Sequence, residues 1–128
     1  MNTDRVSYWI EIAEYDLETA KAMLTTGRYL YVGFMCHQVI EKSLKAHIAK
    51  ADIFPPKIHK LDRLAELAGL AAAFDERQWA LIDRLTPLNV ESRYPEHKEA
   101  MAAQLNESAC KSIITQTEEM LAWIKSRL

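Results

Sequence analysis

One long segment, from Gly33 to Ala51, is patterned as a helix with two different faces. At about 100° per residue, apolar and small side chains fall on one broad arc. These are Val32, Met35, Cys36, Val39, Ile40, Ser43, Leu44 and Ala46. A second group, here named the polar arc, falls on the opposite side near Tyr31 and Phe34 and consists of Gln38, Glu41, Lys42 and Lys45. The apolar side needs a core to bury it. The polar arc is either a solvated face, a binding surface or an internal salt-bridged network, and periodicity alone leaves all three open.

The composition favours an all-helical fold. The chain has 128 residues, enough for one domain with its own core. Only three glycines and four prolines are present, which leaves little material for the tight turns of an all-β protein. We therefore expect a single domain over residues 1–128, folded as an all-α, up-and-down bundle of four to five helices.

The first half of the chain predicts two antiparallel helices. The first should run from about Asp4 to Thr25, with Thr3 or Asp4 as its cap and Gly27 as its stop. The second should run from about Tyr29 to Ala51, and so short a connection makes the two helices neighbours. The prolines at 55 and 56 then require a loop, because the residue before a proline avoids the helical region.

The second half predicts three further helices. One spans about His59 to Gly69, and the next begins at a capping box formed by Asp75 and Gln78 and ends at Pro87. Residues 88–96 have no helical or strand periodicity and are expected to form a loop. The last helix should begin between residues 95 and 106 and continue to the C-terminus, with Asn106 as a cap rather than a glycosylation acceptor.

Several classes of function are disfavoured by what the sequence lacks. With a formal net charge of −2, the chain as a whole lacks the positive charge typical of nucleic-acid-binding proteins, although a local basic patch remains compatible with it. Cys36 and Cys110 lack zinc-ligand spacing, so we expect buried, reduced thiols, no metal and no cofactor. The sequence has no Glu-x-x-His pair, which argues against a di-iron bundle. It also has no glycine-rich phosphate loop, which argues against P-loop and Rossmann nucleotide sites. Without a signal peptide or a long apolar run, we expect a cytoplasmic protein that does not enter membranes.

Several short motifs occur in a characteristic order. They are Trp9 with Ala13, Asp16, Leu17 and Ala20; the Q-x-x-E-K-x-x-K pattern of residues 38–45; His59-Lys60-Leu61 with Leu64; the S-R-Y-P sequence of residues 92–95; and Ala109 with Trp123-Ile124. The combination, which covers nearly the whole chain, resembles the HEPN family (higher eukaryotes and prokaryotes nucleotide-binding domain). The resemblance implies a helical bundle that forms a homodimer. It also implies a minimal nucleotidyltransferase as partner in a two-component, toxin–antitoxin-like system.

Many HEPN proteins are metal-independent endoribonucleases that carry an R-x(4–6)-H motif, so the resemblance also raises the question of catalysis. In that motif the histidine performs acid–base chemistry and the arginine steadies the phosphate. Here Arg93 and His97 are separated by three residues, one fewer than the motif requires, and Pro95 interrupts any regular helix between them. The sequence therefore leaves open whether the protein is an enzyme.

The remaining candidate residues each have a functional and a structural interpretation. Lys42 and Lys45 with Glu41 could take a phosphate of a nucleotide or RNA while the Gln38 amide orients it, with His59, Arg93 and Tyr94 as further candidates. Alternatively, His59 is a cap or loop anchor, and Tyr94 closes the end of the bundle while Arg93 pairs with a glutamate. His37 and His47 are expected to be partly buried. Three hypotheses follow: a phosphate-binding partner subunit, an endoribonuclease toxin using Arg93 and His97, or a purely structural dimerisation module.

Overall fold

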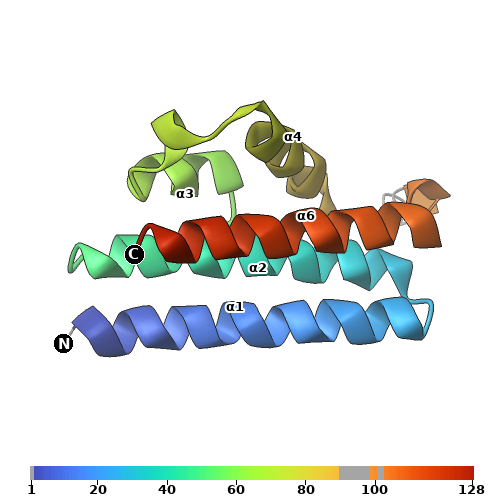
Figure 1. The fold of residues 1–128 in the computed structure, drawn as a ribbon, viewed down its shortest axis with the longest axis horizontal. Helices are drawn as coiled ribbons and strands as arrows, with labels where there is room; N and C mark the ends of the chain where they lie inside the picture. Colours follow the sequence, from blue (N-terminus) through green and yellow to red (C-terminus); the bar gives the residue numbers. More distant parts are fainter. Residues whose placement is uncertain (1, 90–98, 101–102) are drawn as a thin grey trace.

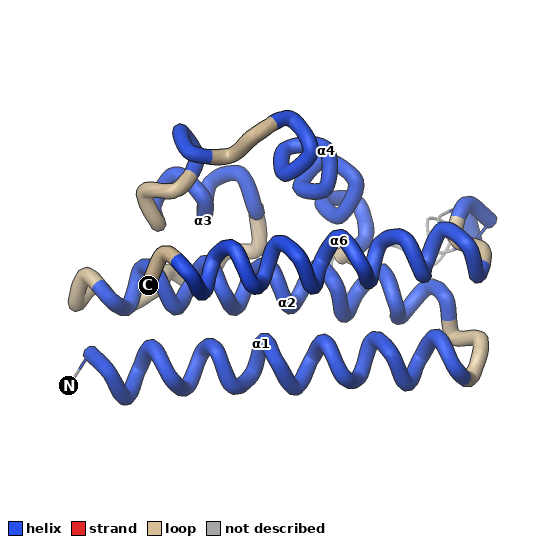
Figure 2. The backbone as a smooth tube through the Cα atoms, in the orientation of Figure 1, coloured by secondary structure: helices blue, strands red, loops and turns tan. Residues whose placement is uncertain are grey.

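The computed structural model describes residues 2–89, 99–100 and 103–128. Within these residues the secondary structure is entirely helical (Figure 2), which confirms the all-α bundle. Three long helices, α1 (Asn2–Thr25), α2 (Tyr29–Lys50) and α6 (Glu107–Ser126), lie side by side along the long axis of the molecule (Figure 1). None of the described helices combines the length and apolar composition that a bilayer crossing demands.

Two short helices cover the side of α2 and α6 that faces away from α1. These are α3 (Leu61–Leu67) and α4 (Glu76–Leu85), and Figure 1 shows both above the long helices, with α1 below. The 3₁₀ segments η1 (Ala71–Ala73) and η2 (Thr86–Leu88) connect this upper layer. As a result α2 is enclosed on several sides, and 15 of its 22 residues are buried. An enclosed helix has no wide face left for solvent.

The close approach of η2 to α2 depends on Gly33. A Cβ atom at this position would lie 2.8 Å from Leu88 Cδ1 and 3.3 Å from Leu105 Cδ1. The missing side chain therefore lets the upper layer pack directly on the first turns of α2.

Most of the predicted helix boundaries are confirmed. Gly27 lies in the turn directly after α1 and has a φ of +74°, a conformation that glycine adopts without strain. The capping box at the start of α4 is present, since Asp75 accepts from the Gln78 N–H and the Gln78 side chain accepts from the Asp75 N–H. Asn106 caps α6 by accepting from the N–H of Ala109 at 2.8 Å.

Other boundaries differ from the prediction. α1 begins at Asn2, so Thr3 and Asp4 lie inside the helix instead of capping it. α3 covers only Leu61–Leu67 of the predicted 59–69 span, because the preceding residue Lys60 is extended and Gly69 has a φ of +75°. The expected loop at 88–96 lies largely outside the described residues.

Candidate functional site

The polar arc is organised around one carboxylate, that of Glu41 on α2. Its side chain is completely buried, with 0% exposure. Oε2 accepts from Lys45 Nζ at 3.1 Å and from Lys42 Nζ at 3.3 Å, and Oε1 accepts from His59 Nδ1 at 3.0 Å. His37 Nδ1 lies 3.7 Å from the same Oε1. We call Glu41, Lys42, Lys45 and His59 the Glu41 network.

The Glu41 network keeps its carboxylate ionised. Burial by itself raises the pKa of Glu41, but the ammonium groups of Lys45 and Lys42 and the hydrogen bond from His59 act in the opposite direction. Together they hold the pKa of Glu41 below its usual value. An unpaired buried carboxylate would cost several kcal/mol, roughly, so each donor is needed to offset that desolvation.

Burial separates the members of the network into two groups. Glu41 and Lys45 are buried, with Lys45 at 5% exposure, so the interpretation of the polar arc as an ordinary solvated face is wrong for both residues. The side chain of Lys42 is 18% exposed and that of His59 is 53% exposed. Any ligand that reaches this network from solvent would therefore meet His59 and Lys42 first.

His59 anchors the loop before α3 to α2. Lys60 is the N-cap of α3 and makes no side-chain cap bond, so His59 is a loop anchor, as one interpretation held, and not a helix cap. Because the Glu41 carboxylate can only accept, Nδ1 of His59 must carry the proton. The neutral ring then presents Nε2 as its unprotonated nitrogen, and no bond to Nε2 exists within the described part of the chain.

Helix α1 contributes Trp9 and Asp16, two residues of the family-like motifs whose role the sequence alone did not indicate. The ring of Trp9 lies 5.7 Å from Lys42 Nζ and 5.6 Å from Lys45 Nζ, within cation–π range. Asp16 lies near Lys42, and burial raises its pKa despite the attraction of that ammonium. A signal for Trp9 was present, because Trp9 and Lys45 are equally distant from the turn at Gly27 and therefore face each other in an antiparallel pair.

The two histidines of α2 are more deeply buried than expected. His37 is 1% exposed and His47 is 8% exposed, whereas both were expected to be only partly buried. His37 Nδ1 lies 3.3 Å from Gln38 Oε1, and His47 Nε2 donates to the carbonyl of Ile124 at 2.8 Å. Burial lowers the pKa of both imidazoles, which keeps them neutral near pH 7. They are therefore packing residues whose polar atoms are hydrogen-bonded inside the bundle.

Thiolate chemistry is disfavoured in this fold. Both cysteines are free and buried, as the sequence predicted. Burial raises the pKa of Cys36 to about 12 and raises that of Cys110 as well, so neither thiol ionises readily. Among the described residues, no three His, Cys, Asp or Glu side chains lie where they could share a metal ion.

The structure brings together four of the predicted site residues and leaves three untested. Glu41, Lys42, Lys45 and His59 form one network, and Gln38 is half-buried beside it, bound to the ring of His37. Arg93, Tyr94 and His97 lie outside the described residues. The described part of the site thus offers a partly exposed ammonium that can donate to an anion, and an imidazole that can do so only when Nε2 is also protonated.

We expect Glu41→Gln to lower the free energy of unfolding by about 3–5 kcal/mol, because it leaves the buried ammonium of Lys45 without its ion-pair partner and removes that of the partly exposed Lys42. Urea unfolding measures this loss. Glu66→Gln is the matched control, since Glu66 pairs with Arg63 at 3.4 Å with 58% of its side chain exposed, and should cost less than about 1 kcal/mol. Equal stability of the two variants would contradict the network.

We also expect stability to fall on mild acidification. The ordinary pKa of histidine is 6.5, and the folded values for His37 and His47 lie lower, so below this pH the unfolded chain binds protons that the folded protein resists. Each imidazole thus contributes no pH dependence well above its unfolded pKa, and at most about 1.4 kcal/mol of lost stability per pH unit below it. Urea unfolding at about pH 7.5 and about pH 5.5 measures the slope, which His47→Gln should reduce. An unchanged slope in this variant would rule out the assigned role of His47.

The HEPN domain family model matches residues 6–127 of the chain. TT1696 from Thermus thermophilus has a similar fold, with a TM-score of 0.82 and 21% identity over 100% of both chains. ST0689, described as an archaeal HEPN homologue, has a TM-score of 0.67 and 21% identity over 95% of this chain and 96% of its own. No curated protein matches the sequence. Since the family match covers nearly the whole chain, this protein belongs to the HEPN domain family.

Proposed function

We propose that this HEPN protein binds a phosphate group of a nucleotide or RNA at the exposed edge of the Glu41 network. In this proposal it acts as a homodimeric partner subunit of a minimal nucleotidyltransferase. The observation that carries the proposal is the convergence of two lysines and a half-exposed histidine on one buried carboxylate. Two ammonium groups against the Glu41 carboxylate leave an excess of one positive charge. An ionised Asp16 beside Lys42 would cancel this charge, but burial raises the pKa of that carboxyl group and so favours its neutral form.

The atoms available to a phosphate are those of Lys42 and His59. Lys42 has three N–H donors and gives one to Glu41, so others remain for a ligand. His59 gives Nδ1–H to Glu41, and protonation of Nε2 would add a second donor on a side chain that is 53% exposed. Lys45 is buried beneath them, where it supplies charge rather than direct contact. A charge-assisted pair of donors of this kind suits a phosphate oxygen.

The partner and the dimer enter the proposal through family membership. Small HEPN proteins of this kind are often encoded beside a minimal nucleotidyltransferase, so the neighbouring reading frame offers an inexpensive check. An ordered anion site on the HEPN subunit would then hold the phosphates of a nucleotide or RNA while the partner acts on it. In this arrangement the Glu41 network serves binding, and the chemical step belongs to the nucleotidyltransferase.

Isothermal titration with ATP, GTP and a short single-stranded RNA tests the ligand. Lys42→Ala should weaken binding by about tenfold or more, the loss expected for one charge-assisted hydrogen bond. For RNA, it should also reduce the salt dependence of the affinity by about 0.7 in log–log slope, the value for one phosphate contact on a single strand. Lys111→Ala is the matched control, because Lys111 is an exposed lysine of α6 paired with Glu107.

Two results would contradict the proposal. One is the absence of binding heat for all three ligands, measured both for the protein alone and in the presence of the neighbouring nucleotidyltransferase. The other is equal affinity of Lys42→Ala and the Lys111→Ala control, with both variants folded. Either result would favour a purely structural role for the network, in which its charges only join α1, α2 and the loop before α3.

A further inference from the structure

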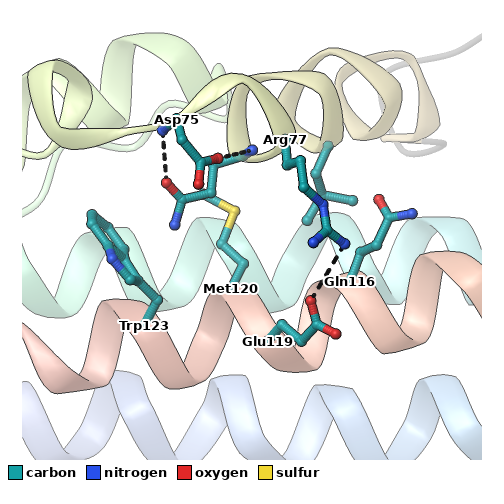
Figure 3. Close-up of a pocket in the computed structure, with 8 residues that line it drawn as sticks. Asp75, Arg77, Gln116, Glu119, Met120 and Trp123 are labelled. Carbon is teal, nitrogen blue, oxygen red and sulfur yellow. Dashed lines mark hydrogen bonds and ion pairs between the residues drawn. The ribbon is translucent and has the colours of Figure 1, made fainter.

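A separate pocket lies between α4 and α6, on a different set of residues from the Glu41 network. Its volume is about 170 Å³, and Figure 3 shows side chains from both helices converging on it. The apolar part of its lining consists of Leu81, Met120 and Trp123. The charged part consists of Asp75, Arg77 and Glu119, which give the lining an excess of one negative charge. The pocket therefore differs in the sign of its charge from the proposed phosphate site.

The size of the pocket limits what it can hold. Pockets for nucleotides and drug-sized ligands usually measure roughly 300–1,000 Å³, well above the 170 Å³ found here. A cavity of about 150 Å³ is large enough for benzene. The pocket thus fits one ring or one side chain, and it is too small to enclose a whole nucleotide.

At the mouth of the pocket, the guanidinium of Arg77 lies where a bound cation would pair with Glu119. Arg77 of α4 reaches toward Glu119 of α6 (Figure 3), but its Nη2 stops 3.8 Å from Oε2 and its side chain is 81% exposed. A pair so long and so exposed contributes little free energy, so an incoming cation can replace it. On the α4 side, Oδ1 of Asp75 accepts the Gln78 N–H, and its carboxylate has further acceptor capacity.

The aromatic wall suits a planar cation. Trp123 packs edge-to-face on Phe74 with ring centroids 5.6 Å apart, which fixes its orientation. The guanidinium of Arg127 lies 4.7 Å from the centre of the same indole ring, so this ring already takes part in one cation–π contact. The thioether of Met120 beside it adds a polarisable apolar surface.

We propose that this pocket binds a single guanidinium or amidinium group carried on a short apolar stem. The planar cation pairs with Glu119 in place of Arg77, and its stem lies against Trp123, Met120 and Leu81. The same chemistry is presented by an arginine side chain of a partner protein and by a free small guanidinium compound. The site goes beyond the proposed phosphate-binding function and does not depend on it.

The probe is benzamidinium, whose ring matches the pocket volume. It is titrated against the full-length protein, and ¹H–¹⁵N NMR spectra follow the Trp123 indole N–H and the backbone amides of α6. We expect saturable shifts with a dissociation constant on the order of 1 mM. Neutral benzamide and anionic benzoate should bind at least about tenfold more weakly. Equal shifts with benzamide and benzamidinium, or none with benzamidinium, would overturn the proposal.

Two variants must act in opposite directions. Glu119→Gln should weaken benzamidinium binding by about three- to fivefold, whereas Arg77→Gln should strengthen it because it removes the internal competitor. Glu118→Gln is the control on the same helix, since Glu118 pairs with Lys21 of α1 and does not line the pocket. A weaker complex with Arg77→Gln, or equal effects of the Glu118 and Glu119 variants, would contradict the assignment.

Two further ligands distinguish the source of the cation. A short peptide with one central arginine is compared with ethylguanidinium. Tighter binding of the peptide identifies a partner protein as the source, and equal affinity identifies a free small cation. Failure of both ligands to bind counts against the pocket, whatever the result with the phosphate ligands.

Discussion

An ionised carboxylate inside the bundle is the interaction on which the rest of this structure depends. Glu41 has no solvent contact, and water cannot compensate its charge. The compensation comes instead from Lys42 and Lys45 on the same helix and from His59 at the start of the upper layer. Burying the Glu41 carboxylate costs roughly several kcal/mol of desolvation, and removing any donor would leave part of this cost without an offset. The polar arc is thus a constraint on the fold as well as a candidate binding site.

The same interaction links elements that are distant in sequence. His59 joins the loop that leads into α3 to α2, and the two ammonium groups lie within cation–π range of Trp9 on α1. Because α2 lies between α1 and the upper layer (Figure 1), the groups bound to one carboxylate on α2 contact both α1 and the loop before α3. The proposed phosphate site uses the exposed edge of this network, so a ligand there would contact groups whose geometry the fold has already set. Such preorganisation lowers the entropic cost of binding.

Local chemistry made much of the fold predictable, and tertiary contacts account for what was missed. The capping pair of Asp75 and Gln78 and the glycine stop at Gly27 follow from backbone rules that act within a few residues. The burial of Glu41 and Lys45 does not, because the helical pattern of a charged face is the same whether that face meets water or another element. Likewise, the sequence placed His59 at the start of a predicted helix, as a cap or loop anchor, but its bond to a residue 18 positions earlier depends on how the preceding loop folds back.

Glu41 is charged and fixes the partly exposed ring of His59 through its Nδ1–H, and this arrangement can be measured directly. Long-range ¹H–¹⁵N correlation spectra of the full-length protein, recorded above the pH at which the imidazole is protonated, report the tautomer of each ring directly. We expect neutral His59 to carry its proton on Nδ1, and Glu41→Gln to remove this preference. A His59 ring that carries its proton on Nε2 in the unmodified protein would contradict this arrangement.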